Sequence, residues 1–379
     1  MARLGELCRI QSGGTPSRSN KTYWENGTIP WVKISDIRSK YLSNTDEFIT
    51  NTGLENSSAK LFPSGTILYT IFATLGEVCI LNIDATTNQA IVGIQIESDK
   101  IESNYLYYYL LSLKPTVNNI GRGVAQNNIN MKILKEFEVP LRPLDEQRKI
   151  AAVLDKVSDL IAKHRQQLDK LDLLVKSQFI VMFQNKGYDV VNAGTVMKNM
   201  RNGLSPSTSG TCHGKVLTLT AFTQGAFDDT QWKDATFAET PPESKRISAS
   251  DFYMCRGNGN VKLVGRGVYA NQSNENLVFP DTVIAASIDT ENICLPYLFM
   301  AWQMPDVRDQ IEKGARTTNG TYKINQKILS DITLILPPLP EQLKFAEVLQ
   351  QTDKSKSTIQ QSLEKLETLK KALMQEYFG

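Results

Sequence analysis

Residues 143–183 read PLDEQRKIAAVLDKVSDLIAKHRQQLDKLDLLVKSQFIVMF, and residues 338–378 read PLPEQLKFAEVLQQTDKSKSTIQQSLEKLETLKKALMQEYF. Aligned without a gap, the two copies share residues from one end to the other, including Pro143/Pro338, Gln147/Gln342, Leu168/Leu363 and Phe183/Phe378. A match spread over that length indicates a tandem repeat in which each half of the chain ends with the same long segment.

Both copies have the residue spacing of a coiled-coil helix. Steps of three and four place these residues in the seam of the first copy: Leu154, Val157, Ile161, His164, Leu168, Leu171, Val175, Gln178 and Met182. In the second copy Thr352, Lys356 and Lys370 interrupt the seam, so that helix is predicted to pack on the first one within the same chain. If a pseudo-twofold axis relates the halves, the helices run antiparallel and hold the two domains at opposite ends as a spacer.

Length and composition favour an ordinary globular protein of two domains. The chain has 379 residues, 41% hydrophobic residues and a formal net charge of +2. No apolar run approaches the ~18 residues of a membrane span, and the first residues lack the apolar core of a signal peptide, so a cytoplasmic protein is expected. With five cysteines, no CxxC pair and two histidines, we expect neither a disulfide framework nor a metal site, including at Cys212–His213.

The first half mixes short strands with one clear helix. Strands are predicted at Ile29–Ile37, Thr66–Phe72 and Val78–Ile83, where β-branched and aromatic residues lie between turn residues. A helix is predicted at Ser103–Leu113, capped by Ser103 or Asn104. We expect its four tyrosines to pack in a core rather than to stack on bases.

Two loops of the first half carry unusual chemistry. Gln11–Asn20 (QSGGTPSRSN) can bring backbone amides close to an anion. Ile120–Asn130 (IGRGVAQNNIN) contains Arg, Asn and Gln, the side chains that can bond two atoms of one base edge. It lies in the segment from Lys114 to Lys135, which has four basic residues and no acidic one. Either loop alone would be read as an ordinary polar turn.

The second half repeats this order with different loops. Arg201–Thr208 can be laid on Gln11–Arg18, and Val216–Phe222 takes the place of Trp31–Ile37. Tyr297–Gln303 corresponds to the tyrosine-rich helix, and Gly314–Gln326 to the Asn-rich loop. A constant frame with different loops is typical of one scaffold that presents two reading surfaces.

These residues resemble the specificity (S) subunits of type I restriction-modification systems. The resemblance covers nearly the whole chain and rests on SGGTPSR, YWENGTIPWVKISDI at Tyr23–Ile37, TNQAI at Thr87–Ile91, and VPLRPLDEQRKIAAVLD at Val139–Asp155 with its repeat LILPPLPEQLKFAEVLQ. It implies a sequence-specific DNA-binding subunit whose two target-recognition domains each read half of a split site in double-stranded DNA. It also implies that the helices set the spacer and dock two methyltransferase (M) subunits, with restriction (R) subunits joining later.

The fold that the repeat and the resemblance together predict is α+β, with two α/β recognition domains that have β-rich cores. Two long antiparallel helices that form an intramolecular coiled coil separate the domains in a pseudo-twofold arrangement. The expected segments are 1–142 (first domain), 143–185 (first helix), 186–337 (second domain) and 338–379 (second helix).

The resemblance also implies which residues contact DNA. In the first domain these are Gly14, Thr15, Ser17, Arg18, Lys33, Asn88, Gln89, Arg122, Gln126 and Asn127. Arg18 and Lys33 are expected at phosphates, and Arg122, Gln126 and Asn127 at bases. In the second domain, where the match is partial, they are Ser205, Ser207, Thr220, Arg266, Gln272, Arg316, Thr318 and Asn319.

No catalytic residue and no bound cofactor is expected in this chain. The sequence has no P-loop, no paired-carboxylate nuclease motif and no glycine fingerprint for a cofactor. S-adenosylmethionine is expected in the partner methyltransferase subunit. The alternatives are a stand-alone nuclease or methyltransferase, and a structural or interaction protein with two domains on a coiled coil and no DNA role.

Overall fold

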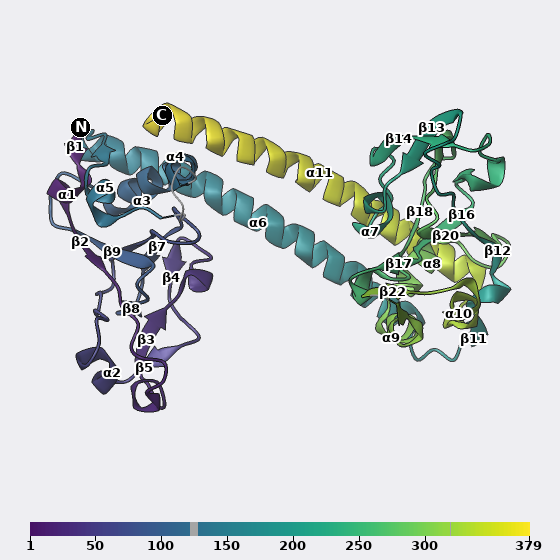
Figure 1. Ribbon diagram of the computed structural model, residues 1–379, viewed down its shortest axis with the longest axis horizontal. Helices are drawn as coiled ribbons and strands as arrows, with labels where there is room; N and C mark the ends of the chain where they lie inside the picture. Colours follow the sequence, from purple (N-terminus) through teal and green to yellow (C-terminus); the bar gives the residue numbers. More distant parts are fainter. Residues whose placement is uncertain (122–127, 319) are drawn as a thin grey trace. The chain divides into compact units, whose positions relative to one another are not determined.

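The computed structural model describes residues 1–121, 128–318 and 320–379 (Figure 1). Contacts divide the chain into two compact units. Unit 1 comprises Met1–Arg165 with Gln360–Gly379, and unit 2 comprises Gln166–Ile359. The boundary therefore falls inside both long helices, α6 (Leu144–Phe183) and α11 (Leu339–Phe378). The division into four segments stays a prediction. In the described part of the chain, no helix is long and apolar enough to cross a membrane.

Unit 1 contains a five-stranded and a three-stranded sheet with helices beside them. The strands of the larger sheet follow the order β2 (Cys8–Ser12), β9 (Ile91–Ile96), β6 (Ile67–Thr70), β7 (Val78–Leu81) and β4 (Tyr41–Leu42). The strands of the smaller sheet follow the order β5 (Phe48–Ile49), β3 (Ile29–Val32) and β8 (Thr86–Thr87). β1 (Ala2–Arg3) pairs with β10 (Glu138–Val139). The helices are α1 (Leu4–Leu7), α2 (Asn51–Glu55), α3 (Ser103–Ser112), α4 (Lys114–Gly121) and α5 (Met131–Lys135), with 3-10 turns at Lys21–Tyr23 and Ile34–Asp36.

Two local predictions in unit 1 need correction and one is confirmed. The strand predicted at Ile29–Ile37 ends at Val32, because Ile34–Asp36 forms a 3-10 turn in which Asp36 accepts a hydrogen bond from the Lys33 amide. The cap of α3 is Glu102, whose carboxylate accepts from the Tyr105 amide at 2.7 Å. The four tyrosines of α3 are buried, as predicted for a packed helix.

Unit 2 has two four-stranded sheets and two smaller ones. One sheet has the order β12 (Met197–Asn202), β20 (Val283–Ile288), β16 (Asp251–Cys255), β18 (Gly267–Tyr269), and the other has the order β14 (Trp232–Phe237), β13 (Cys212–Leu217), β19 (Asn274–Val278), β15 (Arg246–Ile247). A three-stranded sheet has the order β17 (Gly257–Asn258), β22 (Thr321–Lys323), β21 (Arg316–Thr318), and β11 (Asp189–Asn192) pairs with β23 (Thr333–Leu336). The helices are α7 (Thr220–Thr223), α8 (Leu295–Ala301), α9 (Pro305–Gly314) and α10 (Gln326–Asp331), with 3-10 turns at Ala193–Thr195, Glu243–Lys245 and Val261–Leu263. Gly314–Gln326, predicted as a loop, thus contains the β21–β22 hairpin.

The repeat extends to individual buried hydrogen bonds. Gln147 is fully buried; its amide donates to Lys100 and Arg142 carbonyls at 2.8 and 2.7 Å, and its oxygen accepts from the Glu102 amide at 2.9 Å. In unit 2, fully buried Gln342 makes the same three kinds of bond, to Asn292, Pro337 and Cys294, at 2.9, 2.8 and 3.0 Å. Gln147 therefore joins the first turn of α6 to the start of the helix that begins at Ser103. Gln342 joins the first turn of α11 to the start of the helix that begins at Leu295.

The last residue of each long helix packs in an equivalent place. Phe378 at the end of α11 lies against Tyr105 of unit 1, with ring centroids 5.1 Å apart. Phe183 at the end of α6 lies against Tyr297 of unit 2 at 4.9 Å. Tyr105 and Tyr297 each follow the cap of their helix by three residues. Each unit is therefore built on the start of one long helix and the end of the other.

Within each unit the two long helices pair in antiparallel order through polar contacts. In unit 1 His164 lies 3.0 Å from the Ser362 hydroxyl, and Arg165 forms an ion pair with Glu367 at 2.6 Å. In unit 2 Lys356 forms an ion pair with Asp172 at 2.5 Å. A lysine in the seam of the second helix thus finds its partner on the first helix, which confirms that the second helix packs on the first within the chain.

The predicted seam needs one correction near the end of α6. Phe179 and Phe183 are buried there, whereas Gln178 and Met182 are only partly buried. The shift arises because this end of the helix packs on the core of unit 2 as well as on α11, and the phenylalanine rings fill that core.

Candidate nucleic-acid interface

The Gly13–Asn20 loop of unit 1 is pinned to the turn between β8 and β9. The Gly13 amide donates to the Ile91 carbonyl at 3.0 Å, and the Gly14 amide donates to the Thr87 carbonyl at 2.9 Å. A Cβ atom at Gly14 would lie 2.3 Å from the Ser58 carbonyl carbon, so the close approach requires glycine here. The buried indole of Trp31 donates to the Gly14 carbonyl at 3.0 Å and so helps to fix the position of the loop.

A carboxylate links the two residues that are predicted to contact phosphates. Glu47 lies 2.6 Å from the Arg18 guanidinium and 2.7 Å from the Lys33 ammonium. The hydrogen bond from Lys33, aided by Arg18, lowers the pKa of the Glu47 carboxyl, and the same bond raises the pKa of Lys33. The Glu47 carboxylate and the Lys33 ammonium are therefore both charged at neutral pH, and Glu47 contacts the Arg18 and Lys33 side chains together.

Aromatic rings hold the Arg18 guanidinium in place. Its carbon lies 3.6 Å from the centroid of the Trp24 ring and 4.7 Å from that of Trp31. The Trp24 indole in turn donates to the Ser17 carbonyl at 3.1 Å. Stacking of this kind favours a planar cation over a flexible one. About half of the Arg18 side chain remains exposed and can meet a ligand.

The structure brings most of the predicted first-domain residues together. Thr15 donates to Gln89, and the Asn88 side chain accepts from the Ala90 amide at 3.0 Å, so the Gly13–Asn20 loop and the TNQAI turn form one surface. Arg122, Gln126 and Asn127 lie outside the described residues. Sequence reasoning missed Glu47 and Trp24, because nothing in the spacing TDEF or YWEN marks either residue as a neighbour of Arg18.

The second domain has the same pair of backbone hydrogen bonds at the start of this loop, and we call this pair the loop frame. The Gly203 amide donates to the Val283 carbonyl at 3.1 Å, and the Leu204 amide donates to the Phe279 carbonyl at 3.0 Å, as Gly13 and Gly14 do in the first domain. The alignment of Arg201–Thr208 with Gln11–Arg18 is thereby supported. Ser17 and Ser19 hydroxyls lie 2.8 Å apart, and Ser207 and Ser209 hydroxyls 3.3 Å apart.

This frame also identifies the counterpart of the TNQAI turn. Since Phe279 takes the place of Thr87, and Val283 that of Ile91, the positions of Asn88 and Gln89 are occupied by Pro280 and Asp281. Gln272 instead lies on an exposed loop between β18 and β19. It is therefore not the structural equivalent of Gln89.

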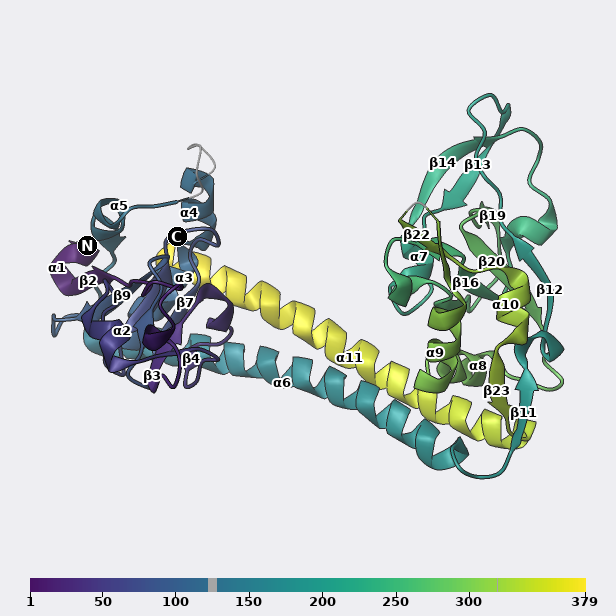
Figure 2. The same cartoon turned by 60° about the horizontal axis from the view of Figure 1, so that its bottom comes forward.

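An open groove of about 650 Å³ lies beside Ser207, over strands β13 and β14. Figure 2 shows these two strands side by side at the edge of their sheet. His213, Lys215 and Lys233 line the groove, and the Lys215 ammonium lies 3.8 Å from the centroid of the Trp232 ring. Sequence reasoning missed these basic residues because the strands themselves were not predicted in full.

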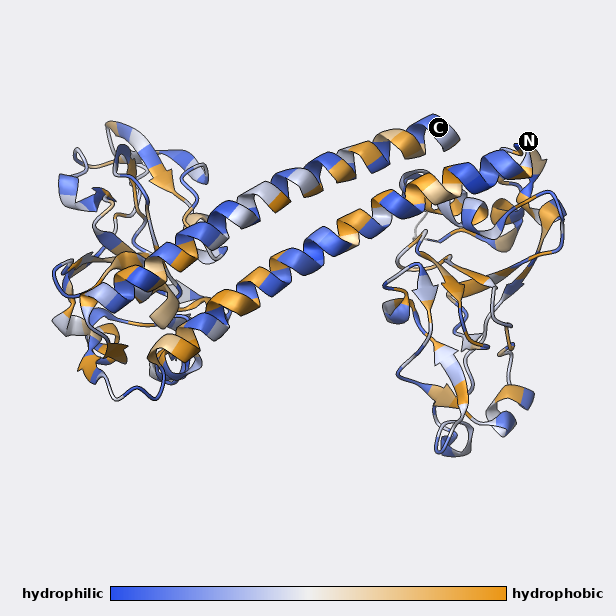
Figure 3. Ribbon diagram, turned by 180° about the vertical axis from the view of Figure 1, so that it is seen from behind, coloured by the Kyte–Doolittle hydropathy of each residue, from blue (hydrophilic) through white to orange (hydrophobic). Residues whose placement is uncertain are grey.

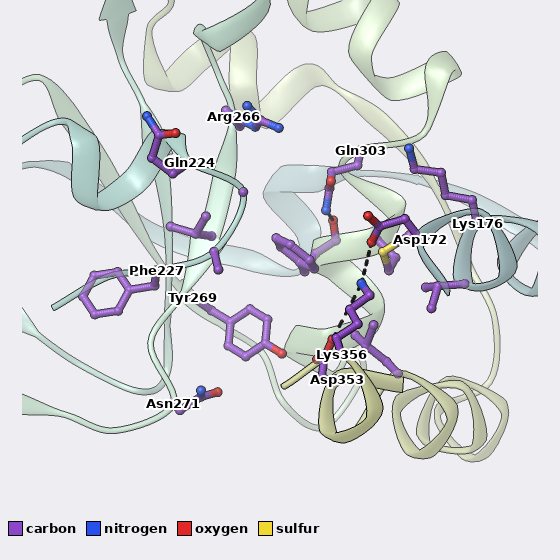
Figure 4. Close-up of a pocket in the computed structure, with 17 residues that line it drawn as sticks. Asp172, Lys176, Gln224, Phe227, Arg266, Tyr269, Asn271, Gln303, Asp353 and Lys356 are labelled. Carbon is purple, nitrogen blue, oxygen red and sulfur yellow. Dashed lines mark hydrogen bonds and ion pairs between the residues drawn. The ribbon is translucent and has the colours of Figure 1, made fainter. Parts of the chain in front are cut away.

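Arg266 lies in a different place, a cavity of about 590 Å³ beside the long helices of unit 2. Figure 4 shows Lys356 directed at Asp172 and Asp353, with Arg266 and Gln303 on the domain side. Burial raises the pKa of Asp353 and exceeds the opposite effect of Lys356. Arg266 donates to the Thr223 carbonyl at 3.0 Å. Acidic and basic side chains both line this cavity, and its lining residues come from the second domain and from the two long helices.

The remaining second-domain residues are spread over other elements. Ser205 follows the Gly203–Leu204 frame, Thr220 begins α7, and Arg316 and Thr318 lie on β21. Asn319 lies outside the described residues. Across the ranges that the structure describes, no group of three His, Cys, Asp or Glu residues could hold a metal ion.

Comparison with known proteins gives a consistent picture. The family model described as "Type I restriction modification DNA specificity domain" matches residues 1–173 and 239–368. The specificity subunit of the type I restriction enzyme MjaIX of Methanocaldococcus jannaschii is 33% identical over 52% of this chain and 51% of its own length. The EcoKI specificity subunit of Escherichia coli is 20% identical over 90% of this chain and 79% of its own length. This chain thus spans about half the length of the first of these relatives.

A solved structure shares the fold. The S subunit of a type I restriction-modification system from M. genitalium superposes with a TM-score of 0.60 at 14% identity, over 100% of this chain and 95% of that one. The predicted combination of mixed α and β domains with two long paired helices is therefore confirmed at the level of fold.

Proposed function

Because the chain belongs to the family of type I restriction-modification DNA specificity domains, we propose that it is the DNA-recognition subunit of a type I restriction-modification complex. Each recognition domain reads one half of a bipartite site in double-stranded DNA. The chain performs no chemistry of its own: methyltransferase subunits that bind S-adenosylmethionine modify adenine, and restriction subunits join them to cut DNA.

The observation that carries this proposal is a constant loop frame with different side chains. Gly13 and Gly203 make equivalent backbone bonds, yet the residues around them differ between the domains. Backbone frames and basic residues beside them position a protein on DNA, whereas side chains at base edges carry the sequence information. Two domains of this kind are suited to reading two different half-sites.

Adenine methylation mapping tests the proposal. Cells that carry the full chain with its methyltransferase subunits are expected to show one bipartite methylated motif that disappears when the chain is deleted. Exchanging GRGVAQNN at 121–128 for another loop should change one half of the motif. A methylated motif that persists without the chain would refute the proposed function.

The long helices present apolar residues that suit a protein partner. Leu173, Leu174, Ile180 and Val181 of α6 are exposed and lie along one stripe, away from buried Val175. Figure 3 shows hydrophobic and hydrophilic residues interspersed along this helix. We assign this stripe to the docking of a methyltransferase subunit.

Placing charges in this stripe is expected to abolish the complex without unfolding the chain. The double variant Leu174→Asp with Val181→Asp should no longer co-purify with the methyltransferase subunit, because charge would be buried at the interface. The double variant Gln166→Asp with Gln167→Asp adds the same charge at exposed polar positions of the helix and should bind normally. Equal co-purification of both variants would place the docking surface elsewhere.

Arg18 and Glu47 are expected to affect DNA affinity in opposite directions. Arg18→Ala removes a phosphate contact, so affinity should fall evenly across sequences and the salt dependence should weaken by about one counterion. Glu47→Gln should tighten binding at low salt, because it leaves Arg18 and Lys33 without their neutralising partner. Titration of duplex DNA at several salt concentrations measures both effects. A changed target motif in Arg18→Ala would instead assign Arg18 to a base.

A further inference from the structure

Strand pairing places Lys233 of the second domain where the first domain has Glu47. In the first domain β3 runs parallel to β8 with Trp31 opposite Thr86. In the second domain β13 runs parallel to β19 with Val216 opposite Val278. The loop frame equates Thr87 with Phe279, so Thr86 corresponds to Val278 and Trp31 to Val216.

The equivalence extends to the antiparallel neighbour of β3 in the first domain and of β13 in the second. The Trp31 amide donates to the Glu47 carbonyl at 2.9 Å, which sets Glu47 opposite Trp31. Val216 is paired with Lys233. The two positions are therefore equivalent in the frame but carry opposite charges.

The surroundings of the two residues differ as well. Glu47 is partly buried between Arg18 and Lys33. By the same register Lys33 corresponds to Thr218, whose hydroxyl donates to the Gln231 carbonyl. Lys233 is exposed and lines the groove over β13 and β14.

Two further observations single out this edge. Lys215, next to Val216 on β13, is a second basic residue that lines the groove, and its ammonium lies 3.8 Å from the centroid of the Trp232 ring. The family model matches residues 1–173 and 239–368, so the whole β13–β14 hairpin lies between its matched segments. Lys233 therefore lies in the part of the second domain that the family model does not match.

We propose that Lys233 determines the specificity of the second domain by contacting guanine in the major groove. The inference rests on the proposed function and names the contact that one half-site makes. Lysine donates to the O6 and N7 acceptors of guanine, and the major groove admits a two-stranded β-ribbon. β14 is one of the two edge strands of its sheet and Lys233 is exposed, so a duplex can approach this residue.

The test compares full-length variants in the complex with methyltransferase subunits. Lys233→Glu and the uncharged Lys233→Gln are set against Lys186→Glu, which makes the same charge change on the exposed loop after α6. The readouts are the methylated motif in cells and the sequences that the purified complex selects from randomised duplex DNA. Lys233→Gln is included because it keeps the motif measurable if Lys233→Glu fails to assemble.

The expected result is a change confined to one half-site. Both Lys233 variants should lose the preference for guanine at one position about ten-fold or more, since a good base contact gives that discrimination. The other half-site and the Lys186→Glu motif should not change. An unchanged motif in both Lys233 variants, with binding either unaffected or weakened evenly across sequences, would overturn the inference while leaving the proposed function intact. The absence of any bipartite motif in the unmodified complex would instead refute the proposed function.

Discussion

Replacing Phe183 by alanine is expected to lower the free energy of unfolding of unit 2 by about 3–5 kcal/mol, the usual cost of removing a fully buried phenylalanine. Phe183 is 0% exposed, and its ring lies 5.0, 4.9 and 5.7 Å from those of Phe179, Tyr297 and Phe345. The substitution would leave a cavity where the end of α6 meets the core of the unit. The neighbouring rings could fill this cavity only if the helices moved.

Hydrogen exchange measured with increasing urea separates the two units and checks this value. Phe378→Ala is the matched control, because it removes the equivalent residue of the repeat from unit 1, where Phe378 is only partly buried. It should cost less, and each variant should accelerate exchange mainly in its own unit. Equal small losses in both variants would mean that the ends of the long helices do not anchor the domains.

The second large effect is expected at Gln342. Gln342→Leu keeps the bulk of the side chain but leaves the Asn292 and Pro337 carbonyls and the Cys294 amide without their partner. Each buried polar group left unpaired costs about 1–3 kcal/mol. We therefore expect unit 2 to lose about 3 kcal/mol or more.

Gln351→Leu provides the control, since Gln351 lies on the same helix but is exposed. Urea unfolding monitored by tryptophan fluorescence should show a clear loss for Gln342→Leu and almost none for Gln351→Leu. If the two variants unfold at the same urea concentration, water must replace the lost hydrogen bonds and the junction is looser than the contacts indicate.

Local patterns were sufficient to predict the two long helices and the tyrosine-rich helix of unit 1. The spacing of Leu154, Val157 and Ile161 predicts a helix with one buried face, and all three are buried. Asn130 and Asn325 each cap a short helix by accepting from the amide three residues later. Periodicity and capping depend on residues a few positions apart, so the sequence displays them directly.

The recognition surface was predictable only in part. The sequence gathers Gly14, Thr15 and Arg18 in one loop, and the structure places Gln89 against that loop. The sequence contains no sign that Glu47 forms an ion pair with Arg18, because the two residues meet only when β3 and β5 pair. A residue's partners across a sheet depend on strand register, which distant turns and packing determine.

The sequence alone determined the tandem repeat, the two long helices that pair with each other, and the resemblance that led to the family. Tertiary structure alone decided that Pro280 and Asp281, not Gln272, replace Asn88 and Gln89, and that Lys233 stands in the place of Glu47. The physical reason is the range of the interactions. Helical spacing and caps are written within a few residues, whereas equivalence between divergent loops is fixed by hydrogen bonds between strands that are far apart in the chain.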